Sequence, residues 1–379
     1  MVAVGPRSWD VLVVGGGPAG STAATLMVHR GLSVALAERE TFPRFHVGES
    51  LLPANTALFD RLGVHEAIRK AGPLVKYGAA FHDQESDLGY AFRFRQDGGL
   101  PGYGYQVKRA EFDAILLDHA RSRGVHVVQP ATVTRPVFDR DGVTVEVERP
   151  GGVDHVHARF LVDASGREGF LARAVGRRHR RPNLGKVALF AHQRGARRFA
   201  GIEEGHIRIY VFPDGWFWWI PFAGDVTSVG AVLHARTVRS WTGSLGTLYD
   251  AMIARVPAVE DGLAGAERVG PVHRMANFAY RNRPVVGNRF LSPSATPSRS
   301  STRSSRLECT SRCSPPSWPR RPSVGPSRPG ASRRDASART SGGWRVGCGP
   351  SSASSTVTIA PRSSTSSSTL SRSWGCARR

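Results

Sequence analysis

A short glycine-rich segment behind an apolar run constrains this sequence more than any other feature. Residues 11–14 read Val-Leu-Val-Val and are followed by GGGPAG at positions 15–20, after which a helical composition begins. This is G-x-G-x-x-G between a buried strand and a helix, the context in which the pattern has a physical meaning. Gly15 permits a tight turn, Gly17 lets a pyrophosphate approach the backbone, and Gly20 allows the helix to pack closely on the strand.

The residues after the glycines complete the pattern of a dinucleotide site. The predicted helix presents free N–H groups, including that of Ala19, and its positive dipole end to a phosphate. Residues 32–37 predict a second strand, and Glu38 at its end stands 18 residues beyond Gly20, where it can accept hydrogen bonds from a ribose hydroxyl. The alternative, a glycine-rich turn beside a surface glutamate, does not explain why strand, spacing, helix and acid occur together. The sequence predicts an α/β, Rossmann-like domain.

The net charge of +22 is distributed very unevenly. Residues 291–379 hold 15 Arg, no Lys and two acids, so they carry +13 and leave +9 for the first 290 residues. A surplus of +9 is ordinary for a protein that binds an anionic cofactor, and we predict no nucleic-acid partner for this part. All four cysteines lie in the basic tail, so we predict neither a disulfide scaffold nor a metal site (Cys309, Cys313, Cys348 and Cys376).

The tail, residues 291–379, is rich in Ser, Arg, Pro and Thr and cannot bury enough apolar surface to fold. It has three interpretations: a disordered basic linker, a nucleic-acid-binding arm, or the product of a frameshift. With GC-rich synonymous codons, residues 294–310 read one nucleotide earlier give V-G-D-A-V-P-F-L-D-P-V-F-S-S-G-V-H-L, and an alanine-leucine helix pattern follows. We favour the frameshift, beginning near residues 291–294.

Three further segments indicate which dinucleotide is bound. The chain has a loop at 42–53, an amphipathic helix led by residues 106–113, and a strand at 159–163 that ends in a small-residue turn. These pieces, in this order, resemble the flavin monooxygenase superfamily with the aromatic-hydroxylase fold, over residues 8 to about 290. The resemblance implies FAD as the cofactor and adds residues that contact it (Arg44, Gly48, Glu49, Ser50, Arg109 and Asp163).

The same resemblance implies a domain plan. The FAD-binding domain is expected at 8–78, 106–168 and 276–290, and an inserted mixed β-sheet substrate domain at 79–105 and 169–275. The second flavin motif of this superfamily, G-D-A followed by D-P, is expected just after residue 290. It is absent from the chain but appears in the shifted frame.

Residues 215–221, Gly-Trp-Phe-Trp-Trp-Ile-Pro, select among flavin enzymes. On a strand, Trp216, Trp218 and Ile220 share one face, while Phe217 and Trp219 share the other. Composition alone favours an ordinary well-packed strand. However, W-x-W-x-I-P, which ends here at Pro221, resembles the signature of flavin-dependent halogenases. In that family these side chains form a wall between flavin and substrate.

Lys76 resembles the halogenase lysine in its position after the loop and helix, although most lysines are surface residues. In that family reduced flavin reacts with oxygen, halide attacks the hydroperoxide to give hypohalous acid, and the lysine delivers the oxidant to an aromatic ring. A partly desolvated lysine suits this role, because burial lowers its pKa. Lys70 and Lys108 lie in contexts typical of a helix surface and a flavin loop, respectively.

The sequence therefore predicts a halogenase acting on an electron-rich aromatic substrate, free or tethered to a carrier protein, with halide and a separate flavin reductase as partners. An aromatic monooxygenase or prenyl-type reductase on the same fold is one alternative, and a non-catalytic truncated flavoprotein is another. Nothing at the start resembles a signal peptide, and no apolar run is long enough to span a membrane, so a cytoplasmic protein is expected.

Overall fold

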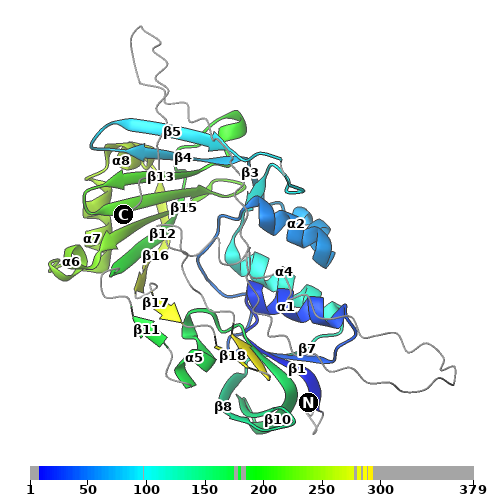
Figure 1. Cartoon of the computed structure of the whole chain (residues 1–379). Helices are drawn as coiled ribbons and strands as arrows, with labels where there is room; N and C mark the ends of the chain where they lie inside the picture. Colours follow the sequence, from blue (N-terminus) through cyan, green and yellow to red (C-terminus); the bar gives the residue numbers. More distant parts are fainter. Residues whose placement is uncertain are drawn as a thin grey trace, which may run out of the picture.

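The computed structural model describes residues 8–96, 98–174, 178–180, 185–276, 280–282, 285–287 and 289–292. Within this part the predicted α/β fold is confirmed, with two large sheets, helices packed on each, and two short two-stranded pairs (Figure 1). The predictions of a disordered, frameshifted tail concern residues that lie, apart from the last strand, outside the described part. None of the helices in the described ranges has the length and apolar content that a membrane crossing requires.

The first sheet is mixed, and its parallel centre carries the glycine loop. Its order is β18-β19-β10-β1-β2-β7, and β9 joins β10 to β8 along an antiparallel extension. β1 pairs in parallel with both β10 and β2, and the side chains of residues 11–14 enter buried clusters on both faces of the sheet, so its sequence is continuously apolar. The strands are β1 (Trp9–Val14), β2 (Val34–Ala37), β7 (His126–Val128), β8 (Thr132–Phe138), β9 (Val143–Arg149), β10 (Gly152–Asp163), β18 (Val285–Gly287) and β19 (Phe290–Ser292).

Helices α1 and α4 pack against each other beside this sheet (Figure 1). The predicted helix at 21–31 begins three residues earlier and ends three residues earlier, and the predicted strand at 32–37 starts at residue 34. Gly31 has φ +78°, a conformation that ends helices. The helices on this side of the molecule are α1 (Pro18–Val28), α2 (Pro53–Leu62), α3 (His65–Lys70), α4 (Arg109–Ser122) and α5 (Phe170–Ala174), with a 3₁₀ turn at Gly166–Glu168.

The second sheet has the order β16-β12-β15-β14-β13-β4-β5 and is antiparallel except where β13 meets β4. One face packs on α7 and α8 around a core that contains Phe217 and Trp219. The strands are β4 (Gly78–Asp83), β5 (Leu88–Arg93), β12 (Lys186–Arg194), β13 (Ile207–Phe212), β14 (Gly215–Pro221), β15 (Val226–His234) and β16 (Glu267–Ala276). The helices are α6 (Ala235–Arg239), α7 (Leu245–Ile253) and α8 (Pro257–Gly262), with a 3₁₀ turn at Gly201–Glu203.

A two-stranded ribbon, β3 (Leu74–Lys76) with β6 (Gly104–Gln106), connects the two halves of the molecule. Its register pairs Lys76 with Gly104 and Val75 with Tyr105. Because side chains alternate along a strand, Lys76 and Gln106 share one face of the ribbon and Val75 and Tyr105 share the other. A second two-stranded pair is antiparallel and joins β11 (Arg178–Arg180) to β17 (Tyr280–Asn282).

Candidate active site

The glycine loop between β1 and α1 admits no larger residue at two of its positions. A Cβ placed on Gly20 would lie 1.8 Å from the carbonyl oxygen of Gly15, and one on Gly15 would lie 2.6 Å from that of Ala164. Gly17 is the N-cap of α1 and supplies no side-chain cap, so the first-turn N–H groups, that of Ala19 among them, remain available to a ligand. This fits the pyrophosphate of a dinucleotide.

Glu38 lies where the sequence predicts, buried at the end of β2. One carboxylate oxygen accepts a hydrogen bond from the Gly16 N–H at 2.6 Å, and the other accepts one from the Glu40 N–H at 2.9 Å. Each carboxylate oxygen can accept a second hydrogen bond. The side chain is thereby fixed against the glycine loop with capacity left for a ribose hydroxyl, so the loop and the acid together fit the adenosine half of FAD.

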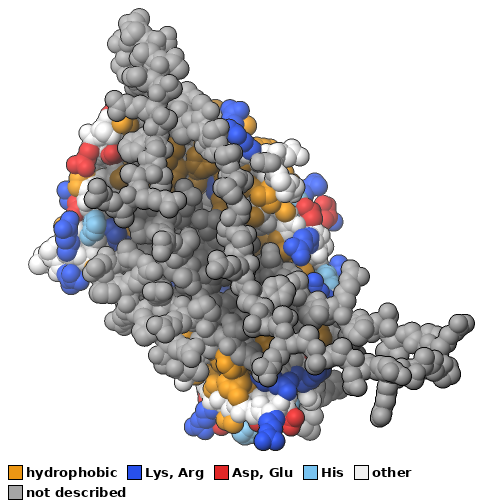
Figure 2. Space-filling model, viewed as in Figure 1, with side chains coloured by type: hydrophobic (Ala, Val, Ile, Leu, Met, Phe, Trp, Pro, Cys, Tyr) orange, Lys and Arg blue, Asp and Glu red, His pale blue; other side chains and the backbone are white. Residues whose placement is uncertain are grey.

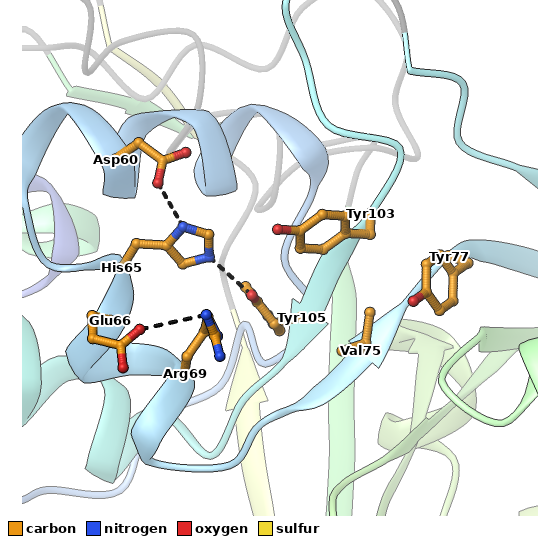
Figure 3. Close-up of a pocket in the computed structure, with 8 residues that line it drawn as sticks. All are labelled: Asp60, His65, Glu66, Arg69, Val75, Tyr77, Tyr103 and Tyr105. Carbon is orange, nitrogen blue, oxygen red and sulfur yellow. Dashed lines mark hydrogen bonds and ion pairs between the residues drawn. The ribbon is translucent and has the colours of Figure 1, made fainter.

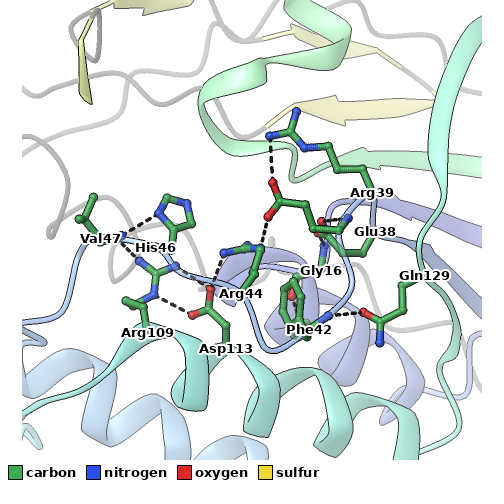
Figure 4. A network of polar contacts seen from close by, with 12 residues as sticks. Gly16, Glu38, Arg39, Phe42, Arg44, His46, Val47, Arg109, Asp113 and Gln129 are labelled. Carbon is green, nitrogen blue, oxygen red and sulfur yellow. Dashed lines mark hydrogen bonds and ion pairs between the residues drawn. The ribbon is translucent and has the colours of Figure 1, made fainter. Parts of the chain in front are cut away.

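Arg44 and Arg109 meet on one buried carboxylate, that of Asp113 (Figure 4). Arg109 binds it with two nitrogens, at 2.7 and 2.8 Å, and an Arg44 nitrogen lies 3.3 Å away. A Cβ on Gly17 would lie 3.6 Å from Arg44, which places this guanidinium beside the phosphate loop. Gly48 has φ +102°, a backbone conformation that favours glycine, and a Cβ there would lie 2.8 Å from Arg109. The network joins the 42–53 loop to α4.

The field around this network is positive. Burial, and then the charges of Arg109 and Arg44, lower the pKa of His46 from 6.5 to about 3. The Val47 N–H donates to Nδ1 of His46 at 2.9 Å, which requires that nitrogen to be unprotonated. A neutral imidazole among guanidinium groups leaves the local charge positive, and that suits an anion such as a phosphate.

Lys76 is the most completely buried of the predicted site residues that carry a charge, at 1% exposure. Its Nζ donates to Ser50 Oγ at 2.8 Å and to the Leu51 carbonyl oxygen at 3.1 Å, and lies 5.1 Å from the centre of the Phe94 ring. The lysine therefore joins the ribbon to the Gly-Glu-Ser part of the loop. Lys70 and Lys108, which sequence reasoning set apart from it, are both exposed.

Glu49, beside Ser50, is 2% exposed and lies 2.9 Å from Nε2 of His192 on β12. The contact ties the loop to the second sheet, although the two residues are 143 positions apart. The resemblance to flavin enzymes predicts that Glu49 and Ser50 contact the flavin, but no motif in the sequence marks His192 as their neighbour.

The tryptophan strand presents the two faces that its alternation predicts. Trp218 and Ile220, with Trp216 packed against them, form one cluster with Phe190, while Phe217 and Trp219 belong to the core beneath α7 and α8. Pro221 is the last residue of the strand. The loop reaches this aromatic face: the ring of Phe45 lies 6.0 Å from that of Phe190, which lies 5.6 Å from that of Trp218.

Asp163 has a different environment from the other predicted residues. One carboxylate oxygen accepts hydrogen bonds from Ser165, and the other accepts one from the Leu171 N–H at 2.9 Å. The side chain thus shapes the turn that follows β10, close to Gly15. Asp113 lies in the predicted 106–113 segment, but the sequence prediction gives it no role, whereas the structure makes it the partner of both arginines. The spacing of four residues between Arg109 and Asp113 on a predicted helix indicates such an ion pair.

A cavity of about 530 Å³ lies on the opposite face of the ribbon from Lys76 (Figure 3). His65, one of its lining residues, lies 2.6 Å from a carboxylate oxygen of Asp60 and 2.9 Å from the Tyr105 hydroxyl. The remaining lining residues are Glu66, Arg69, Val75, Tyr77 and Tyr103. Among the described residues, no group of His, Cys, Asp or Glu side chains is arranged to hold a metal ion.

These features fit a dinucleotide-binding protein, and comparison with known proteins identifies the dinucleotide as FAD. The FAD binding domain family matches residues 8–236. A tryptophan 2-halogenase of Chondromyces crocatus is 35% identical over 76% of this chain and 55% of its own length. A 1H-pyrrole-2-carbonyl-[peptidyl-carrier protein] chlorinase of Pseudomonas fluorescens is 31% identical over 75% of this chain and 69% of its own. The structure of the myxobacterial chondrochloren halogenase superposes on this chain with a TM-score of 0.72 and 34% identity. The superposition covers 76% of this chain and 68% of the halogenase chain.

Within the FAD-binding proteins, this chain belongs to the family of flavin-dependent halogenases. The family predicted from the glycine loop and the tryptophan strand is thereby confirmed, and FAD is its cofactor. The chain spans little more than half the length of the tryptophan 2-halogenase that it matches.

Proposed function

We propose that the protein halogenates an electron-rich aromatic ring, such as a phenol or a pyrrole, free or tethered to a carrier protein. The observation that carries this proposal is Lys76, which is buried and held by hydrogen bonds to Ser50 and Leu51 between the flavin loop and the second sheet. A lysine is almost never fully buried unless its environment is built for it, and such residues concentrate at functional sites. The relatives act on tryptophan and on a carrier-bound pyrrole, which supports the aromatic substrate class.

The chain's residues divide the work of binding. Gly15, Gly17, Ala19 and Gly20 would hold the pyrophosphate of FAD, and Glu38 would bind the ribose. Arg44 and Arg109, whose polar contacts are drawn in Figure 4, would line the flavin together with Gly48, Glu49 and Ser50. Asp163 would hold the turn beside the glycine loop.

When bound and reduced, FAD supplies the means of converting oxygen and halide to hypohalous acid. Lys76 Nζ would then bind this acid by a hydrogen bond and orient its halogen toward the substrate ring. Trp216, Trp218 and Ile220, with Pro221 at the strand end, would separate the ring from the flavin and exclude water from the path.

The proposal extends to the organisation of the chain and its supply of electrons. Residues 8–78, 106–168 and 276–290 would form the FAD-binding unit, and 79–105 with 169–275 the substrate unit. A separate flavin reductase would deliver reduced flavin in the cytoplasm. Where described side chains are visible in Figure 2, basic and acidic ones are interspersed.

The test uses full-length protein with FAD, a flavin reductase, NADH, chloride or bromide, and a panel of phenols and pyrroles, with products read by mass spectrometry. Lys76→Met should lower the yield of halogenated product about 100-fold or more while FAD binding, read by absorbance, persists. Lys70→Met, a change at an exposed lysine, is the control and should retain the yield. Hydroxylated product that survives Lys76→Met would instead identify a monooxygenase, and a chain that binds no FAD would be a truncated, non-catalytic remnant of a flavoprotein.

A further inference from the structure

A turn of the second half of the chain packs directly on the lysine-bearing face of the β3–β6 ribbon. A Cβ on Gly205 would lie 1.8 Å from the Val75 carbonyl oxygen and 3.3 Å from Lys76 Cα. Gln106, on the same ribbon face as Lys76, donates from Nε2 to the Gly205 carbonyl oxygen at 2.8 Å. His206, the next residue, is therefore held beside the proposed catalytic lysine.

His206 is buried, and neither of its ring nitrogens has a hydrogen-bond partner. Its exposure is 2%, and its Nε2 lies 2.9 Å from where a Cβ on Gly78 would be, so the ring occupies the space that this glycine leaves open. The Oε1 atom of Gln106 is buried without a partner as well. An unsatisfied buried polar group costs about 1–3 kcal/mol, so such groups persist where function requires them.

The charges around His206 come from several elements. Lys76 on β3, Arg93 on β5 and Arg208 on β13 oppose its protonation, and Glu203 in the preceding 3₁₀ turn favours it. Burial is the largest influence, and the net result is that the pKa of His206 lies below its ordinary value of 6.5. The ring is therefore neutral near pH 7, with one nitrogen that can accept a proton and one that donates.

We propose that His206 is a positioning residue for Lys76: through one water molecule, also bound by Gln106, it accepts a proton from the lysine ammonium. This inference rests on the proposed role of Lys76 in halogenation. One N–H bond of the ammonium breaks, and its electron pair stays on Nζ. The water takes that proton and passes one of its own to a ring nitrogen of His206. The positive charge moves to the imidazole, and a neutral amine remains to receive hypohalous acid.

The water accounts for the geometry. His206 and Lys76 share no direct hydrogen bond, since both imidazole nitrogens lack partners. A buried water requires two to four polar partners. A ring nitrogen of His206 and the Oε1 atom of Gln106 are two such groups, both beside the Gly205 turn.

The chain is well suited to a direct test because it contains only four lysines, at positions 70, 76, 108 and 186. Full-length protein labelled with [6-¹³C]lysine and free of added FAD would be titrated by NMR, with the Lys76 signal assigned through Lys76→Met. We expect that signal to shift in the acid range as His206 takes up its proton, and this step to vanish in His206→Gln. His65→Gln is the matched control, because His65 lies on the opposite face of the ribbon, and should retain the step.

The reciprocal measurement leaves His206 in place. Coupling between two sites acts equally in both directions. In ¹³C-histidine-labelled protein, Lys76→Met should therefore raise the pH at which His206 titrates, because a neighbouring positive charge is lost. Lys70→Met should leave it unchanged. A Lys76 signal without the acid step, or a His206 titration that is the same in wild type and Lys76→Met, would overturn the proposal.

Activity gives an independent measure that a purely structural role would not change. Halogenation should decline as pH falls through the titration of His206, because a protonated imidazole accepts no further proton. In His206→Gln the rate should be lower and this decline absent. A lower unfolding midpoint with an unaltered pH profile would mean that His206 only packs. If the coupling is present but no product forms at any pH, the proposed function fails and the Lys76–His206 pairing stands; product without coupling gives the opposite result.

Discussion

Two buried polar clusters flank the 42–53 loop, and they differ in how their polar atoms find hydrogen-bond partners. In the Asp113 cluster, formed by Asp113, Arg44 and Arg109, one carboxylate receives two guanidinium groups within the chain. In the Lys76 cluster, formed by Lys76, Gln106 and His206, three nitrogen and oxygen atoms on Gln106 and His206 have no partner. The first cluster pairs its charges within the chain, with Arg44 Nη1 held by the Asp113 carboxylate at 3.3 Å rather than by a hydrogen bond, and forms a scaffold. In the second, the three atoms include those through which we propose that a water molecule joins His206 and Gln106 to Lys76.

Asp113→Asn is expected to have the largest effect, because it leaves two largely buried arginines facing a neutral amide. The free energy of unfolding should fall by about 3 kcal/mol, measured by urea denaturation. Asp118→Asn, on the same helix, is the matched control. Its partner is Arg121 and both side chains are exposed, so the loss should stay under about 1 kcal/mol. Equal losses in the two variants would remove the distinction between the clusters.

His46→Asn should change how stability depends on pH. The pKa of His46 falls from 6.5 in the unfolded chain to about 3 in the folded protein, so between these values the unfolded state binds more protons and stability rises with pH. Lowering the pH from 7 to 5 should therefore cost wild type about 2 kcal/mol through this group. His46→Asn should lack that contribution, as seen in urea midpoints at the two pH values. A parallel decline in both proteins would mean that burial and the neighbouring arginines lower the pKa of His46 less than the structure indicates.

Lys76→Met is expected to have the smallest effect on stability, despite the burial of the residue. It loses two hydrogen bonds but also removes the need to desolvate an amine. The free energy of unfolding should change by no more than about 1 kcal/mol, or even increase, by the same urea measurement. A loss as large as that of Asp113→Asn would show that the Lys76 cluster is a scaffold too.

Features that depend on local sequence were predictable. The glycine loop, Glu38 and the two faces of the tryptophan strand follow from spacing and alternation, and the structure has all of them. Burial on both sides of β1 likewise follows from its unbroken apolar run. Helix ends shifted by a few residues, because the glycine that ends α1 acts from beyond its last helical residue.

Contacts between distant segments were not predictable. Glu49 meets His192, and Gln106 meets Gly205 beside His206, through the way the two sheets are brought together. His206 belongs to no sequence motif, so nothing in the sequence indicates that it is buried beside Lys76. The frameshift stays a prediction, to be decided by sequencing codons 288–296. β19 pairs in parallel with β10 in the first sheet and ends near the point where the resemblance predicts the second flavin motif.

The β3–β6 ribbon is a single layer that separates the cavity from the protein interior. Its register determines which of the two sides each side chain faces. With the present pairing, Val75 and Tyr105 border the cavity while Lys76 and Gln106 enter the interior. A slip of one position in either strand would send that strand's side chains to the other side. The lysine would then stand in the open cavity among tyrosines, ionised by water and far from Ser50. In this molecule the placement of the proposed catalytic amine thus depends on strand alignment as much as on residue type.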